Sequence, residues 1–255
     1  IISSARLIQG KYLQTTSTAV EGANTNYTFD YQDGYYGANT NANYISWMWK
    51  RAPNFFDVVA YSGIGAAQDI THNLGVVPEM MWIKERSDDT GSWYVWHSSF
   101  SANDYIWLNF TNSKLVNSAY FPSVPTDTQF SVGTSDDISG VGDNYIAYLF
   151  ASLDGVSKVG SYTGNGSTQT IDCGFSSGAR FVLIKRTDST GDWYVWDTER
   201  GIVAGNDPHL SLNTTAAEVT TDDSIDPVSS GFAVNQDAAT NINVSSASYI
   251  FYAIA

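Results

Sequence analysis

The chain repeats itself with a period of about 100 residues, and a repeat of this length constrains the architecture before any motif is considered. The positions that recur 101 residues apart are Tyr61, Gly63, Gly65, Gln68, Ile70, Ile83 and Lys84, matched by Tyr162, Gly164, Gly166, Gln169, Ile171, Ile184 and Lys185. After the loss of one residue in a turn, Trp93–Trp96 recurs as Trp193–Trp196. Recurring positions are predicted to be scaffold. Positions that differ between the copies are where a specific function is expected.

A partial third copy precedes these two. The full copies end in aromatic, apolar runs, Tyr145–Phe150 and Tyr249–Ile254, and the run Tyr44–Trp49 resembles both. Phe29 also lies 101 residues before Phe130. We therefore predict three parts, which are the closing half of a preceding unit (1–52), a first β-unit (53–153) and a second β-unit (154–255). This interpretation makes the chain a piece of a longer polypeptide of tandem domains. The alternative for 1–52 is an N-terminal arm with a chance similarity.

The composition excludes several classes of partner. Only 15% of the residues are charged, and the formal net charge is −14 with 12 basic residues. Nucleic-acid binding and adsorption to anionic membranes both need clustered Lys and Arg, so we expect neither. No apolar run approaches the ~20 residues that span a bilayer, so membrane insertion is not expected. The single cysteine, Cys173, excludes an intrachain disulfide framework, and we predict a buried thiol.

The apolar residues favour strands. They come in runs of four to eight, separated by Gly, Asn, Asp and Ser clusters. We predict an all-β fold of tandem antiparallel β-sandwich domains of jelly-roll-like type. The stretches 58–61 and 68–71 are predicted to form a hairpin, with positive φ at Gly63 and Gly65. Trp93–Trp96 carries no polar residue on either side, so both of its faces are expected to be covered by a second sheet and by a neighbouring unit or chain.

Groups that could support catalysis or metal binding are few. The three histidines, His72, His97 and His209, are not spaced as zinc ligands, and no cysteine pair assists them. Adjacent acidic residues occur at three places, Asp88-Asp89, Asp136-Asp137 and Asp222-Asp223. Each pair lies in a turn-like stretch, where Asp bonds its own backbone, so we interpret all three as solvated turns. A calcium site and a catalytic carboxylate pair are the alternatives. We predict no catalytic residue, no metal site and no cofactor.

Aromatic side chains are the remaining candidates for a binding surface, because flat rings pack against sugars and tyrosine adds a hydroxyl. The aromatic residues of Trp93–Trp96 recur in both copies and are assigned to packing. Aromatic residues that recur less and lie in turn-rich stretches are better candidates for receptor or glycan contact. They are Tyr35, Tyr36, Tyr105, Trp107 and Tyr120.

Several stretches resemble a repeat domain of tail-fibre-like and other virion proteins of tailed phages, notably phages of marine bacteria and cyanobacteria. The stretches are Lys50–Val59, His72–Met80, Gly178–Asp188, Leu212–Ala217 and Tyr249–Ala255. The resemblance covers about residues 44–255. It implies a virion component of the tail-fibre kind, trimeric as such fibres usually are, and it brings no catalytic motif.

Together, the resemblance and the composition predict a non-enzymatic tail-fibre segment of a phage virion that contributes to host-surface attachment from outside the cell. The expected partners are identical subunits in a homotrimer, other virion tail proteins and host surface polysaccharide. A surface rich in Ser, Thr and Asn can hydrogen-bond glycans, and several copies convert weak contacts into avidity. Two alternatives stay open: a capsid or tail decoration protein that stabilises the particle, and a tailspike-like glycan hydrolase.

Overall fold

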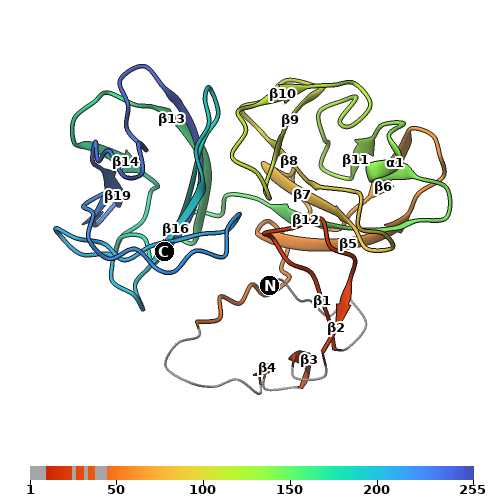
Figure 1. The fold of residues 1–255 in the computed structure, drawn as a ribbon, viewed down its shortest axis with the longest axis horizontal. Helices are drawn as coiled ribbons and strands as arrows, with labels where there is room; N and C mark the ends of the chain where they lie inside the picture. Colours follow the sequence, from red (N-terminus) through yellow and green to blue (C-terminus); the bar gives the residue numbers. More distant parts are fainter. Residues whose placement is uncertain (1–9, 25–26, 32–33, 38–44) are drawn as a thin grey trace.

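The computed structural model describes the backbone of residues 10–24, 27–31, 34–37 and 45–255. Within these ranges the regular structure is strand, apart from one short helix, α1 (Asp136–Ser139). The chain forms three lobes: an N-terminal segment up to residue 52, unit 1 (53–153) and unit 2 (154–255) (Figure 1). The predicted all-β fold of antiparallel sheets is confirmed. No helix in the described ranges is long and apolar enough to cross a membrane.

Unit 1 packs a six-stranded antiparallel sheet, in the order β10-β9-β8-β7-β12-β5, with a two-stranded sheet, β11-β6. The strands are β5 (Phe56–Ser62), β6 (Gln68–Thr71), β7 (Met80–Glu85), β8 (Trp93–His97), β9 (Asp104–Trp107), β10 (Leu115–Val116), β11 (Gln129–Val132) and β12 (Asn144–Phe150). Every residue of β7 and β8 is buried. The expectation that both faces of the Trp93–Trp96 strand are covered is therefore confirmed.

Unit 2 repeats this arrangement with a five-stranded sheet, β13-β20-β15-β16-β17, and a three-stranded sheet, β14-β19-β18. The strands are β13 (Ser157–Thr163), β14 (Gln169–Asp172), β15 (Phe181–Arg186), β16 (Trp193–Asp197), β17 (Leu210–Ser211), β18 (Ile225–Val228), β19 (Gly231–Val234) and β20 (Ser248–Ile254). Cys173 is buried, as predicted, and burial raises the pKa of its thiol to about 12.

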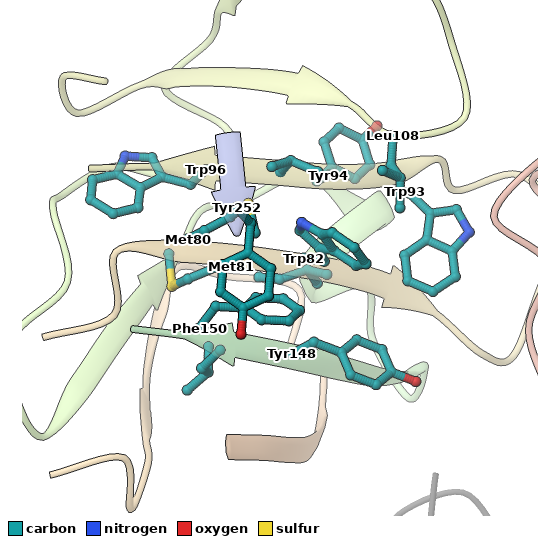
Figure 2. Packing of buried hydrophobic residues seen from close by; sticks show 14 of the residues in the cluster. Met80, Met81, Trp82, Trp93, Tyr94, Trp96, Leu108, Tyr148, Phe150 and Tyr252 are labelled. Atoms are coloured by element: carbon teal, nitrogen blue, oxygen red, sulfur yellow. The ribbon is translucent and has the colours of Figure 1, made fainter. Parts of the chain in front are cut away.

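The units are not independent, because one hydrophobic core contains buried residues from all three lobes, including Leu13, Trp82 and Tyr252. Figure 2 shows Tyr252 of unit 2 among the unit 1 residues of this core. The ring centroids of Phe150 and Tyr252 are 5.1 Å apart, and those of Phe150 and Trp82 are 4.9 Å apart. Burial of these large rings supplies much of the free energy that joins the units.

The N-terminal segment reproduces the β9–β10 hairpin of unit 1 with a constant shift of 93 residues. Strand β1 (Lys11–Tyr12) pairs with β2 (Gly22–Ala23) in the register Lys11↔Ala23, as Asp104 pairs with Val116. Gly10 and Asn103, which precede the two hairpins, both have positive φ, at 78° and 71°. The remaining described strands of this segment are β3 (Tyr27–Tyr31) and β4 (Gly34–Gly37).

Both hairpins also dock on the following unit in the same way. Trp93 Nε1 donates to the carbonyl of Gln14 at 2.8 Å, and Trp193 Nε1 donates to the carbonyl of Trp107 at 2.8 Å. The amide of Glu21 donates to the Arg86 carbonyl at 3.2 Å, and the amide of Lys114 donates to the Thr187 carbonyl at 2.8 Å. One interface therefore occurs twice, between the N-terminal segment and unit 1 and between unit 1 and unit 2.

The predicted hairpin between the stretches 58–61 and 68–71 is wrong. Strand β5 pairs with β12, whereas β6 pairs with β11 in the other sheet, so the chain crosses between sheets at this turn. Gly65 has positive φ, at 71°, but Gly63 does not. Gly63 is instead needed for close approach, because a Cβ there would lie 2.1 Å from the carbonyl oxygen of Gly140. Turn glycines predicted a reversal, but they could not specify which sheet receives the returning strand.

Candidate functional site

The structure gathers three of the five predicted contact residues. Tyr105 and Trp107 lie on β9, and Tyr120 precedes β11. The Tyr105 ring centroid lies 4.6 Å from that of Tyr120 and 5.7 Å from that of Trp107. Tyr105 is buried and the other two are half-buried, so the group offers only part of its ring surface to a ligand. The other two candidates, Tyr35 and Tyr36, belong to β4, and their side chains lie outside the described part of the chain.

The carboxylate of Asp137 joins Tyr120 of this group to the neighbouring Tyr94. Tyr94 Oη donates to Asp137 Oδ2 at 2.6 Å, and Tyr120 Oη donates to the same oxygen at 3.2 Å. Burial, followed by the hydrogen bond to Asp137, raises the pKa of Tyr94. Asp137 lies in the first turn of α1, where Ser135 provides the N-cap. The interpretation of Asp136-Asp137 as a solvated turn is therefore wrong for Asp137. Its place in the first turn of α1 lets its carboxylate accept hydrogen bonds from Tyr94 and Tyr120.

An acidic hollow of unit 1 lies beside α1 and was not predicted. It has a volume of about 460 Å³ and lies where the end of β7, the β7–β8 turn and the loops around α1 meet. Its lining residues are Glu85, Asp88, Thr90, Asp136, Val141 and Asp143. Four of these six carry carboxylates and none is basic, so the hollow has a strongly negative potential.

Glu85 is the buried member of this set, with 2% of its surface exposed. Its Oε1 has no hydrogen-bond partner. Burial, together with the carboxylates of Asp88 and Asp143, raises the pKa of Glu85 to about 7, and Lys84 opposes this rise. The Lys84 ammonium is itself buried and donates at 2.8 Å to the backbone carbonyl of Glu85. Burial lowers the pKa of Lys84 to about 8.

Unit 2 carries the opposite charge at the matching position. Glu85 pairs across the sheet with Tyr145, and Arg186 pairs with Tyr249, so Glu85 and Arg186 occupy the same place in the two units. Arg186 forms a two-pronged ion pair with Asp188, with Nε–Oδ1 and Nη2–Oδ2 distances of 3.0 and 3.1 Å. A difference between the copies was expected to mark function, and this exchange of charge was a signal available in the sequence.

Unit 2 also contains a buried polar group that superficially resembles a catalytic triad. His209 Nδ1 lies 3.3 Å from Asp222 Oδ1, and the Ser224 hydroxyl donates to Asp222 Oδ2 at 3.0 Å. The serine therefore contacts the acid and not the histidine, and all three residues are at least 94% buried. This geometry does not activate a nucleophile. Asp222 is also not in a solvated turn, since it joins a buried hydrogen-bond network.

Among the described residues, no three His, Cys, Asp or Glu side chains are grouped closely enough to hold a metal ion. The molecule is thus a protein of two repeated antiparallel β-units, each with buried polar groups of its own. The chain belongs to the family described as Domain of unknown function (DUF7483), which matches residues 8–255. The match includes the N-terminal segment together with both units. No curated protein and no solved structure matches the chain.

Proposed function

We propose that this chain is a non-enzymatic structural segment of a phage virion, a tail-fibre module that contributes to attachment at the host surface. The sequence stretches that resemble virion repeat domains support the virion assignment. The observation that carries the structural role is the docking interface that occurs twice, since it joins successive β-units into one stiff block. A rigid block in which only 15% of the residues are charged suits a fibre that holds a binding surface away from the particle.

The state of the reactive groups supports a role without catalysis. Cys173, His97 and His209 are buried. Burial lowers the pKa of His97 to about 3 and lowers that of His209. Both imidazoles lie away from the open surface where a substrate could bind. The preceding hairpin docks on each Trp-bearing strand, through Trp93 in unit 1 and through Trp193 in unit 2. These side chains therefore serve the packing of one unit on the next rather than ligand binding.

Three measurements test the proposal. Gold-labelled antibody against the chain should mark the tail fibres of intact virions in electron micrographs, and purified chain should reduce adsorption of the phage to its host. Light scattering should find three chains per particle, as expected for a fibre. Label confined to the capsid would favour the decoration role instead. Reducing sugar released from host polysaccharide would replace the proposal with the glycan hydrolase.

A further inference from the structure

We propose that the acidic hollow of unit 1 binds a guanidinium group, namely an arginine side chain presented by a partner protein. The proposal concerns the residues around Glu85 alone, so it does not depend on whether the chain belongs to a tail fibre. It rests on an unsatisfied buried carboxylate, the surrounding charge and the comparison between the two units.

The first argument is the state of Glu85. A carboxylate with 2% exposure and an oxygen without a partner is costly, because ionisation away from water must be compensated by a cation or by hydrogen bonds. Glu85 lines the hollow, whereas the adjacent Arg86 is engaged elsewhere, with Nε donating to Glu21 Oε2 at 2.7 Å. The Lys84 ammonium donates to the backbone carbonyl of Glu85.

The second argument is the charge around Glu85. The other lining carboxylates belong to Asp88, Asp136 and Asp143, which come from the β7–β8 turn and from the segment around α1. Asp137, on α1, also faces Glu85 closely enough to raise its pKa, and Lys84 is the one base among the groups that act on it. A cation in the hollow would therefore be attracted by several negative groups at once.

The third argument identifies the cation. In unit 2 the same strand position is held by the Arg186 guanidinium, which forms a fork with Asp188. Unit 2 thus supplies its own guanidinium beside a carboxylate, and unit 1 has carboxylates without one. A small metal ion is disfavoured, since the described acidic groups are not placed close enough together to coordinate it. A planar guanidinium, with several donors, suits separated carboxylates better than a compact ion.

The probe for the experiment is N-acetyl-arginine amide, with the neutral N-acetyl-citrulline amide as its matched control. Binding is followed by NMR of the ¹³C-labelled Glu85 carboxyl in the full chain. We expect the arginine probe to shift this resonance and to lower the pKa of Glu85, and we expect citrulline to do neither. The Glu85→Gln variant should weaken binding by about tenfold or more, because a charge-assisted bond is lost. Asp127→Asn, which removes an exposed charge outside the hollow, should change affinity less than about twofold.

Several outcomes would overturn the assignment. Equal binding of arginine and citrulline probes would exclude charge recognition. A tighter complex with N-acetyl-lysine amide or with Ca²⁺ would show that the site does not select guanidinium. Unchanged affinity in Glu85→Gln would remove Glu85 from the site. If that variant does not fold, the titration of Glu85 in the unmodified chain decides the question, since a pKa that is the same with and without the arginine probe contradicts the proposal.

Discussion

At the scale of single residues, the exchange of Glu85 for Arg186 between equivalent strands has an energetic cost in unit 1. Glu85 has a pKa of about 7 in the folded chain, against an ordinary value of 4.5. The folded state therefore holds this proton more tightly than the unfolded state does. The stability that results is fully present below about pH 4.5, is lost as the pH rises towards 7, and stays lost above that.

Glu85→Gln should remove this dependence, because glutamine does not ionise. The variant and the unmodified chain should be close in unfolding free energy near pH 4, and the variant should be more stable by about 2 kcal/mol near pH 8. Urea unfolding at a series of pH values measures the difference, with Asp127→Asn as the control that should not diverge in this way. A constant difference between the Glu85→Gln variant and the unmodified chain at every pH would show that folding does not raise the pKa of Glu85.

Gly63 illustrates a residue whose role was only partly predictable. The repeat identified it as scaffold, but the reason is a close approach to Gly140 rather than positive φ. Gly63→Ala should cost about 2–4 kcal/mol in unfolding free energy, since backbone would have to move. Gly191→Ala is the matched control, because its Cβ would meet only Arg186 Cβ, at 3.4 Å, and it should change stability by less than about 1 kcal/mol. Equal losses in the two variants would contradict this explanation.

At the scale of strands and hairpins, the sequence pattern predicted the large-sheet strands at 58–61 and Trp93–Trp96 to within two residues of β5 and β8, because both are apolar runs bounded by polar turns. Pairing was less predictable. Strands β5 and β6 are adjacent in sequence but lie in different sheets. The hairpin at residues 10–24 was also missed, because its likeness to β9–β10 lies in backbone register and not in its side chains.

Trp193 holds the β9–β10 hairpin of unit 1 against unit 2, so Trp193→Phe should destabilise this interface and leave the rest of unit 1 unaffected. Loss of the indole N–H leaves the carbonyl of Trp107 without this donor, which should cost about 1–3 kcal/mol. Amide exchange should accelerate at Lys114 and Gly191, which donate across the same interface, and stay unchanged within the β5–β12 ladder of unit 1. Trp93→Phe should have the same effect on the amide of Glu21. Uniform acceleration throughout the chain would show that the interface does not open locally.

At the scale of the whole molecule, a core that contains residues of all three lobes makes the units depend on each other. Two sandwiches joined only by a linker would unfold separately. Here the units share one core, so unfolding of one unit would expose apolar side chains of the other and destabilise it. We therefore expect the unmodified chain to unfold in one cooperative transition by calorimetry. The contact between Phe150 and Tyr252 is the place where this coupling can be weakened.

Tyr252→Ala should split the single transition into two, because it removes a ring that packs on unit 1 as well as within unit 2. Phe232→Ala is the matched control: Phe232 is fully buried but belongs to the second core of unit 2 and packs on Phe251. Each change should cost about 3–5 kcal/mol. Loss of Phe232 should lower the temperature of one joint transition, whereas loss of Tyr252 should separate the melting of unit 1 from that of unit 2. Two transitions already present in the unmodified chain, or the same behaviour in both variants, would mean that the shared core does not couple the units.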